Sequence, residues 1–324
     1  MKLFHNIDRW EMVTPFVTSR ESTSHIDTLT VTLSENGQAG RGEALGVDYL
    51  GETALTMAAQ LEKVRTDIEA GIDFDELGQL LPVGGTRNAV DCALWDLRAK
   101  QGGQRVWEML GLRTDPVRTV YTLSLDSVEK MATEAARHRD FPVLKLKLDQ
   151  EQVAEKVRAI RSVRPDATLL IDANCAWSVA LLESVANVLQ SCRIAVVEQP
   201  LATSADDELQ ALDYPVTLCA DESCQGLSDL ESVDGRYQMV NIKLDKCGGL
   251  SEALRMVKWC RRHDLEPMVG NMLGSSLAMA PAFLIAQFCC FVDLDGPLLQ
   301  SEDRSTPIRY EGARMFAPEA ALWG

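Results

Sequence analysis

The sequence predicts an α/β protein in which a (β/α)8-type barrel follows a separate α+β unit. Strand patterns and then helix patterns occupy roughly the first hundred residues, the order expected of a self-contained α+β unit. After that, short β-rich runs alternate with amphipathic helices over roughly 180 residues, the repeat of a trimmed barrel. We therefore expect the last helix to be short or missing. The predicted boundaries are 1–112 for the first unit, 113–300 for the barrel and 301–324 for a tail that folds back on the first unit.

The first unit is expected to contain a hairpin and two helices. Residues 26–34 alternate apolar and small polar side chains, as a half-buried strand does. The Glu-Asn-Gly sequence at 35–37 is a hairpin turn signal that leads into a second short strand at 39–44. Residues 52–70 and 88–101 carry apolar side chains at helical spacing.

The predicted barrel strands are short runs rich in apolar and β-branched residues, each followed by a turn or a helical pattern. The eight strands are expected at 120–125, 143–148, 168–171, 194–197, 216–219, 239–244, 267–269 and 291–294. Helical patterns lie between them, for example at 153–163, 180–189, 251–262 and 277–288.

Composition restricts the class of function. The formal net charge of −16 argues against nucleic acid and anionic membrane surfaces as partners. No apolar run approaches the ~20 residues that span a bilayer, and the N-terminus lacks the apolar core of a signal peptide. The nine cysteines form no metal-binding repeat, so we interpret them as reduced core residues of a cytoplasmic protein. An assembly of identical subunits is compatible with these features.

Acidic residues end three successive predicted strands, at the rim where barrel enzymes have their active sites. They are Asp172, Glu198 and Asp221, each about one βα repeat from the next. Three carboxylates at close range repel one another unless a counter-charge lies between them. A hard divalent cation would resolve this, and oxygen-only ligands favour Mg²⁺ or Mn²⁺ over zinc. The sequence therefore predicts a metal site.

Lysines flank this predicted metal site. Lys145 and Lys147 end the second strand on one face, because side chains alternate along a strand, and Lys243 ends the sixth. Amines on two sides suit removal of a proton from one face of a carbon next to a carboxylate and its return to the other, with Lys145 and the metal stabilising the charge. We expect neighbouring cations to lower the pKa of Lys147 and Lys243 toward neutrality.

A lone Lys-x-Lys is more often a solvated strand face, and a lone strand-end aspartate is more often a helix cap. Asp293 and Asp295, at the eighth predicted strand, are by themselves compatible with a loop containing Asx turns. Six strands carrying the expected charge, in order and in one phase, favour a catalytic site. Glu222 and Asp245 are adjacent acids with weaker claims, as auxiliary metal ligands or as partners of the ligands.

Three other protein classes are alternatives. A metal-dependent barrel hydrolase usually builds its site from histidines, and none of the four histidines ends a predicted strand. A Schiff-base aldolase using Lys243 is an alternative that borohydride trapping would support, whereas loss of activity with a chelator would support the metal site. A non-catalytic barrel would have no need of charges in its mouth.

Long segments of the chain resemble the enolase superfamily, in the subgroup that includes the muconate lactonising enzymes, and most of all its dipeptide epimerases of the L-Ala-D/L-Glu type. The segments are Arg-Asn-Ala-Val-Asp-Cys-Ala-Leu-Trp-Asp-Leu at 87–97, Ala-Asp-Glu-Ser-Cys at 220–224 and Val-Asn-Ile-Lys-Leu-Asp-Lys-Cys-Gly-Gly-Leu at 240–250. The resemblance implies a dipeptide substrate whose C-terminal α-carbon is inverted by two-base proton transfer through an enediolate. It also implies that the first unit is a cap over the barrel, completed by the tail.

The resemblance also assigns roles to the residues. It implies one Mg²⁺ per subunit, replaceable by Mn²⁺, on Asp172, Glu198 and Asp221. Lys147 and Lys243 would be the acid/base catalysts. The residues implied to contact the substrate are Lys145, Thr122, Asn271, Leu273 and, at its α-ammonium group, Asp293 and Asp295. Substrates of the related N-acylamino acid racemases and o-succinylbenzoate synthases have no free α-ammonium group, so the aspartate pair disfavours those alternatives.

The resemblance implies that two loops of the cap, near 15–25 and 46–52, contact the substrate side chains and determine specificity. Ala-Glu epimerases have in the first loop an arginine that pairs with the glutamate side chain. Thr23 stands at that position here, and Arg20 lies slightly earlier in the same loop. We therefore expect that the C-terminal residue of the substrate need not be acidic.

Overall fold

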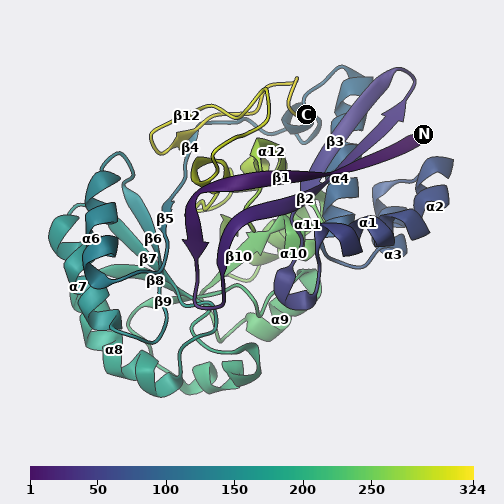
Figure 1. Ribbon diagram of the computed structural model, residues 1–324. Helices are drawn as coiled ribbons and strands as arrows, with labels where there is room; N and C mark the ends of the chain where they lie inside the picture. The colour runs from purple at the N-terminus through teal and green to yellow at the C-terminus, as the bar shows by residue number, and fades with distance from the viewer.

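The computed structural model describes residues 1–324 and has two parts, a cap and a barrel (Figure 1). The cap begins with an antiparallel sheet of order β1-β2-β3, formed by β1 (Lys2–Val17), β2 (Ser22–Glu35) and β3 (Gln38–Ala44). The predicted hairpin is confirmed, and Asn36 and Gly37 form its turn with φ values of 52° and 79°. Positive φ at both turn positions matches the twist of the two strands.

Helices cover the cap sheet: α1 (Ala54–Lys63), α2 (Arg65–Ala70), α3 (Phe74–Leu80) and α4 (Gly85–Gly102). The single helix expected at 52–70 is wrong, because Val64 leaves helical geometry (φ −109°, ψ 6°) and separates α1 from α2. The break lets Ile68 of α2 stay buried in the same apolar cluster as Leu61 of α1.

Glycine in β3 lets the long helix α4 lie directly on the cap sheet. A Cβ at Gly40 would stand 2.2 Å from the carbonyl oxygen of Ala93, so only glycine permits this approach. The helix also reaches the barrel, where Arg87 Nη2 donates to the carbonyl oxygen of Cys247 at 2.7 Å. α4 therefore joins the two parts of the molecule.

The barrel contains seven parallel strands in the order β5 to β11, so each strand pairs with its neighbours in sequence. They are β5 (Tyr121–Leu123), β6 (Val143–Lys147), β7 (Thr168–Asp172), β8 (Ile194–Glu198), β9 (Thr217–Ala220), β10 (Met239–Lys243) and β11 (Glu266–Gly270). The helices of the barrel are α6 (Val128–Arg137), α7 (Val153–Val163), α8 (Val179–Ser191), α9 (Leu230–Val233), α10 (Leu244–Cys247), α11 (Leu250–Cys260) and α12 (Ser276–Ala286).

The eighth predicted strand is reduced to isolated bridges of one residue. The run at 291–294 forms no regular strand, and Val292 alone bridges Val269 of β11 and Thr119, which precedes β5. Its carbonyl oxygen accepts from Val120 N at 2.8 Å, so the ring of strands still closes. The last helix is replaced by a 3-10 turn, η4 (Gly296–Leu299), as the trimmed barrel predicts. A 3-10 segment, η2 (Thr203–Ala211), also stands where a helix would follow β8.

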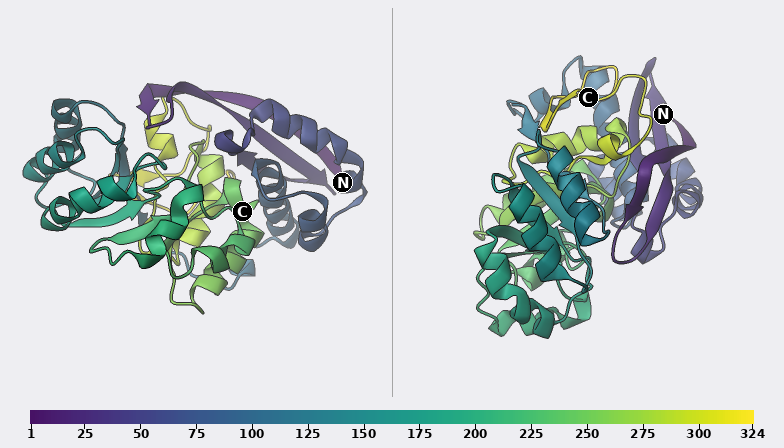
Figure 2. Two further views of the ribbon diagram at one scale, coloured as in Figure 1. Left: turned by 90° about the horizontal axis from the view of Figure 1, so that it is seen from below. Right: turned by 60° about the vertical axis from the view of Figure 1, so that its left-hand side comes forward.

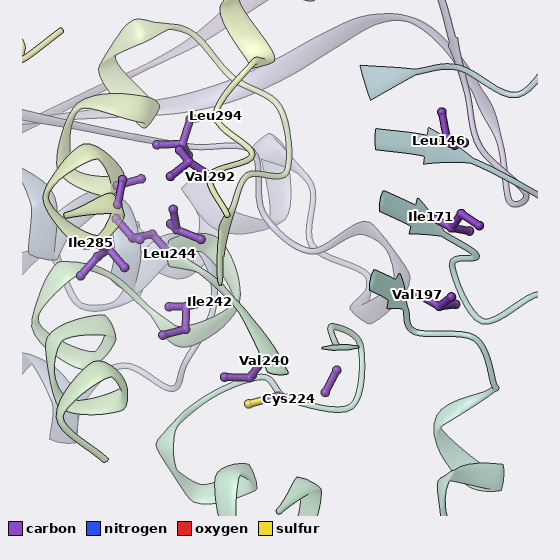
Figure 3. Packing of buried hydrophobic residues seen from close by; sticks show 14 of the residues in the cluster. Leu146, Ile171, Val197, Cys224, Val240, Ile242, Leu244, Ile285, Val292 and Leu294 are labelled. Carbon is purple, nitrogen blue, oxygen red and sulfur yellow. The ribbon is translucent and has the colours of Figure 1, made fainter. Parts of the chain in front are cut away.

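Alternation along the strands separates the apolar shell from the interior of the barrel. Leu146, Ile171 and Val197 lie on neighbouring strands in the large cluster that the surrounding helices cover (Figure 3). Leu170 and Val196, one position earlier on their strands, belong to a separate small cluster. Because side chains two positions apart share a face, the last residue of each of these strands lies above this small cluster.

The C-terminal tail lies against α4 and the start of the barrel (Figure 2). It forms β12 (Tyr310–Glu311) and β13 (Arg314–Met315), which extend a small sheet with β4 (Val117–Arg118). Trp323 is fully buried, and its indole Nε1 donates to the carbonyl oxygen of Cys92 at 3.0 Å. No helix combines the length and the apolar composition needed to cross a bilayer. All nine cysteines are free.

Candidate active site

Three acidic side chains converge at the carboxyl ends of β7, β8 and β9. Asp172, Glu198 and Asp221 place carboxylate oxygens within 4.8 Å of one another, and each residue is at most 1% exposed. The parallel register explains this, because Asp172 is the direct partner of Glu198 across β7 and β8. The trio predicted from the sequence is therefore assembled at one point.

The electrostatics of the trio fit a hard divalent cation. Burial, reinforced by the charge of Asp172, raises the pKa of Glu198 to about 8. This carboxyl would thus resist ionisation at neutral pH unless another positive charge lay beside it. Three buried carboxylates offer only oxygen ligands, the donor set that Mg²⁺ and Mn²⁺ prefer.

Lys145 lies at the centre of the acidic residues. Its ammonium is 2.8 Å from Glu198 Oε2, 3.0 Å from Asp172 Oδ2 and 2.8 Å from Asp293 Oδ2. Burial alone would lower the pKa of this lysine, but the surrounding carboxylates, Asp172 first, outweigh burial and hold the pKa well above its usual range. Lys145 is therefore a fixed positive charge.

Lys147 and Lys243 contact different members of the trio. Lys147 Nζ donates to Asp172 Oδ2 at 2.6 Å and Asn174 Oδ1 at 3.2 Å, whereas Lys243 Nζ donates to Asp221 Oδ2 at 2.7 Å. Since β6 and β10 stand on opposite flanks of the β7–β9 segment, the two amines approach the trio from two sides.

The expected lowering of the lysine pKa is wrong for Lys243 in this structure. Burial lowers its pKa, but the charge of Asp221 outweighs burial, and the net shift is upward. A divalent cation on the trio would act in the opposite direction, because it adds positive charge beside the ammonium.

Next to the trio is a cavity of about 470 Å³ between the barrel and the cap, within the size range of small-molecule sites. Its walls include all eight predicted lysine and substrate-contact side chains: Lys145, Lys147, Lys243, Thr122, Asn271, Leu273, Asp293 and Asp295. The structure thus brings every one of these residues to a single space, with the acidic trio beneath it.

One wall of the cavity is acidic. Asp295 Oδ2 accepts from Thr122 N at 2.7 Å, and burial together with the nearby Asp293 raises the pKa of Asp295 to about 7. Asn271 holds this wall, since its Nδ2 donates to the carbonyl oxygen of Asp293 at 2.6 Å. Leu273 adopts φ 74°, which is rare for a branched side chain and is typical of functional sites. The wall suits a cationic group.

The first cap segment, expected to be a loop, is mostly strand. Phe16 pairs with Thr23 and Val17 with Ser22, so only residues 18–21 form the turn of the β1–β2 hairpin. The turn reaches the strand ends of the barrel (Figure 1). Arg20 and Thr23 both line the cavity, as does Asp48 of the second cap segment, which contains η1 (Asp48–Leu50).

The two auxiliary acids hold the cap segments and lie outside the trio. Glu222 Oε1 accepts from Arg20 Nη1 at 2.6 Å, and Asp245 Oδ1 accepts from Gly46 N at 2.9 Å. One oxygen of each carboxylate is thus bound to the cap, and Glu222 Oε1 also accepts from Asn174, next to the trio.

Sequence reasoning missed two residues of the site. Lys246 Nζ lies 2.6 Å from Asp221 Oδ1 and is 1% exposed, and Asn174 is the partner of Lys147 described above. Both stand within three residues of a predicted site residue. Only Asn174 could have been predicted from the sequence, because it follows Asp172 by two positions at the end of a strand and so is expected on the same face.

Two family models match the chain. The mandelate racemase/muconate lactonizing enzyme N-terminal domain matches residues 2–111, and the enolase C-terminal domain-like model matches residues 127–321. The chain is 37% identical over 306 residues to the L-Ala-D/L-Glu epimerase of Escherichia coli strain K12, covering 94% of this chain and 95% of that protein. It is 36% identical over 298 residues to the N-acetyl-D-glutamate racemase of a Pseudoalteromonas species, covering 91% and 95%.

The chain is also similar in structure to solved members of the same group of proteins. An enolase family member from Agrobacterium tumefaciens, described as homologous to dipeptide epimerases and bound to sodium and L-Ala-L-Glu, superposes with a TM-score of 0.97 at 39% identity, covering 99% of both chains. The dipeptide epimerase from Methylococcus capsulatus, complexed with Mg and L-Arg-D-Lys, superposes with a TM-score of 0.90 at 29% identity, covering 98% of both chains.

Proposed function

This chain belongs to the mandelate racemase/muconate lactonizing enzyme family of the enolase superfamily, and we propose that it is a magnesium-dependent dipeptide epimerase. One observation carries the proposal: two lysine amines, on β6 and β10, approach one buried carboxylate trio from two sides. Several relatives named as dipeptide epimerases also support it. The reaction is the inversion of the α-carbon of the C-terminal residue.

Lys147 and Lys243 are proposed as the two bases. One removes the α-proton from its face of the substrate, and the other returns a proton to the opposite face through an enediolate. Their separate hydrogen bonds, to Asp172 at 2.6 Å and to Asp221 at 2.7 Å, support this division of roles. Lys145 is proposed to bind a substrate carboxylate oxygen and to stabilise the negative charge that develops there.

Asp172, Glu198 and Asp221 are proposed to hold the Mg²⁺ ion, for which Mn²⁺ could substitute. When bound, the ion supplies positive charge that stabilises the substrate carboxylate as its charge grows. The chain itself contributes the burial of the trio, which keeps water from screening that charge.

Asp293 and Asp295 are proposed to bind the free α-ammonium group of a dipeptide. Their support is the acidic cavity wall described above, to which Thr122 and Asn271 add hydrogen bonds. A second candidate substrate is an N-acetylated amino acid, favoured by the similarity to the N-acetyl-D-glutamate racemase. An acetyl group has no charge to pair with two carboxylates, so we place the dipeptide first.

The C-terminal side chain of the substrate is proposed not to require an acidic group. Thr23 offers the cavity a hydroxyl, and Arg20 is already paired with Glu222. We also propose that the enzyme acts in the cytoplasm, where nine unpaired thiols would remain reduced.

The test is exchange of the α-proton in D₂O with Mg²⁺ present, across a library of L,L-dipeptides and N-acetylamino acids, followed by NMR. We expect exchange at the C-terminal residue of dipeptides, lost on addition of a chelator. Exchange confined to N-acetylamino acids would favour the second candidate. Strict dependence on C-terminal Asp or Glu would refute the proposed side-chain range, and a lysine adduct trapped by borohydride would favour an aldolase.

A further inference from the structure

The two proposed bases differ in how the cap touches them. Phe16, in the β1–β2 hairpin, places its ring centroid 5.9 Å from Lys147 Nζ. The side-chain contacts of Lys243 come from Asp221 and from Met272 Sδ at 3.8 Å, both in the barrel. Both amines line the cavity, but the hairpin makes a direct contact with Lys147 and none with Lys243.

The turn of the hairpin is hydrogen-bonded to the segment that follows β7. Ser19 Oγ donates to the carbonyl oxygen of Ala173 at 3.3 Å, directly before Asn174. Arg20 pairs with Glu222 at 2.6 Å, and its guanidinium lies 4.8 Å from the ring centroid of Tyr49. Behind the turn, Leu125 N donates to the carbonyl oxygen of Val17 at 2.9 Å, which ties the hairpin to the barrel a second time.

A chain of hydrogen bonds continues from the hairpin to Lys147. Glu222 Oε1, which accepts from Arg20, also accepts from Asn174 Nδ2 at 3.4 Å. Asn174 Oδ1 in turn accepts from Lys147 Nζ at 3.2 Å. Asn174 and Cys175 are both in the left-handed backbone region, with φ values of 44° and 67°, which asparagine tolerates better than most residues. This turn fixes the position of the Asn174 backbone, and the hydrogen bond to Glu222 orients its side-chain amide.

We propose that Glu222 and Asn174 are positioning residues that couple docking of the cap hairpin to the orientation of Lys147, whereas this chain of hydrogen bonds does not reach Lys243. The proposal rests on the proposed function, in which each lysine serves one face of the substrate. Without the docked hairpin, Lys147 keeps its 2.6 Å bond to Asp172 and loses Phe16 and the oriented Asn174. Its ammonium then follows Asp172 and no longer faces the substrate, so one direction of proton removal slows and the other does not.

The experiment measures α-proton exchange separately for the two epimers of one accepted substrate. Lys147→Ala identifies the epimer whose exchange depends on Lys147. Glu222→Gln keeps the size and an acceptor for Asn174 but removes the charge that pairs with Arg20. We expect it to slow exchange of the Lys147-dependent epimer by about tenfold to a hundredfold, the cost of a misplacement of about 1 Å, with little change for the other epimer. Asn174→Ala should reproduce this selectivity.

The matched control is Arg9→Gln, in the same hairpin. Arg9 forms an exposed pair with Asp27 at 2.8 Å, so this variant removes a charge from the hairpin without a contact to the barrel. It should exchange both epimers at the wild-type rates. Equal slowing of both epimers by Glu222→Gln, or slowing of neither, would overturn the coupling.

A second measurement does not depend on turnover. Competitive amine labelling, read by peptide mass spectrometry, compares the reactivity of Lys147 with that of Lys243 in one sample. The ratio should change in Glu222→Gln and stay at the wild-type value in Arg9→Gln, and an unchanged ratio would overturn the proposal. If wild-type protein exchanges no dipeptide proton, the proposed function fails, while this ratio still decides the coupling.

Discussion

Asp245 lends itself to a quantitative test of the cap–barrel junction. The residue is 5% exposed, and its Oδ1 accepts from Gly46 N at 2.9 Å, at the start of the second cap segment. Burial, partly offset by the hydrogen bond from Gly46, raises the pKa of Asp245 from 3.8 to about 7. Asp245→Asn keeps an acceptor for Gly46 and removes the charge.

The direction in which stability changes with pH follows from proton binding to Asp245. The folded protein holds a proton on Asp245 up to a higher pH than the unfolded chain does, so the contribution of this carboxyl to stability falls as pH rises from about 4 to about 7. A shift of about 3 pH units corresponds to about 4 kcal/mol, of which about 3 kcal/mol lies above pH 5. Relative to wild type, Asp245→Asn should therefore gain about 3 kcal/mol between pH 5 and pH 8.

Urea unfolding of both proteins across this pH range measures the difference. Other titrating groups cancel, because they are common to both chains. Asp213→Asn, at an exposed position, controls for the loss of one negative charge and should show a flat difference. If the difference in free energy of unfolding between Asp245→Asn and wild type also stays constant with pH, burial does not raise the pKa of Asp245, and the prediction is refuted.

Three further predictions concern the proposed active site and the tail. Lys147→Ala and Lys243→Ala should each slow epimerisation by roughly 10²–10⁴-fold and retain α-proton exchange of opposite epimers; retention of the same epimer by both would contradict the two-base assignment. Asp295→Ala should raise KM for dipeptides while Mn²⁺ affinity, measured by calorimetry, stays unchanged; an unaltered KM removes the main support for ammonium binding. Trp323→Ala should lower the free energy of unfolding by about 3–5 kcal/mol in urea, because the indole is fully buried; a loss under 1 kcal/mol would mean that the tail adds little to the fold.

The acidic trio and its lysines were predictable from the sequence for a local reason. Successive side chains of a strand point to opposite faces, so residues two positions apart share a face. Lys145 and Lys147 therefore lie on one face of their strand, whatever surrounds it. Parallel strands also end at one edge, and this rule alone brings Asp172, Glu198 and Asp221 together once the alternation of strands and helices is recognised. Nothing in this step requires knowledge of a distant contact.

The tertiary structure decided what the isolated patterns leave open. The run at 291–294 has the composition of a strand, but only Val292 pairs, in isolated bridges to Val269 and Thr119. The sign of the Lys243 pKa shift depends on the balance between burial and Asp221, which no local pattern contains. Glu222 meets Arg20 across 202 positions of sequence, and Asp245 meets Gly46 across 199. Such pairs form only when the cap closes on the barrel, since the geometry of the whole chain, and not the residue types alone, sets the distance between them.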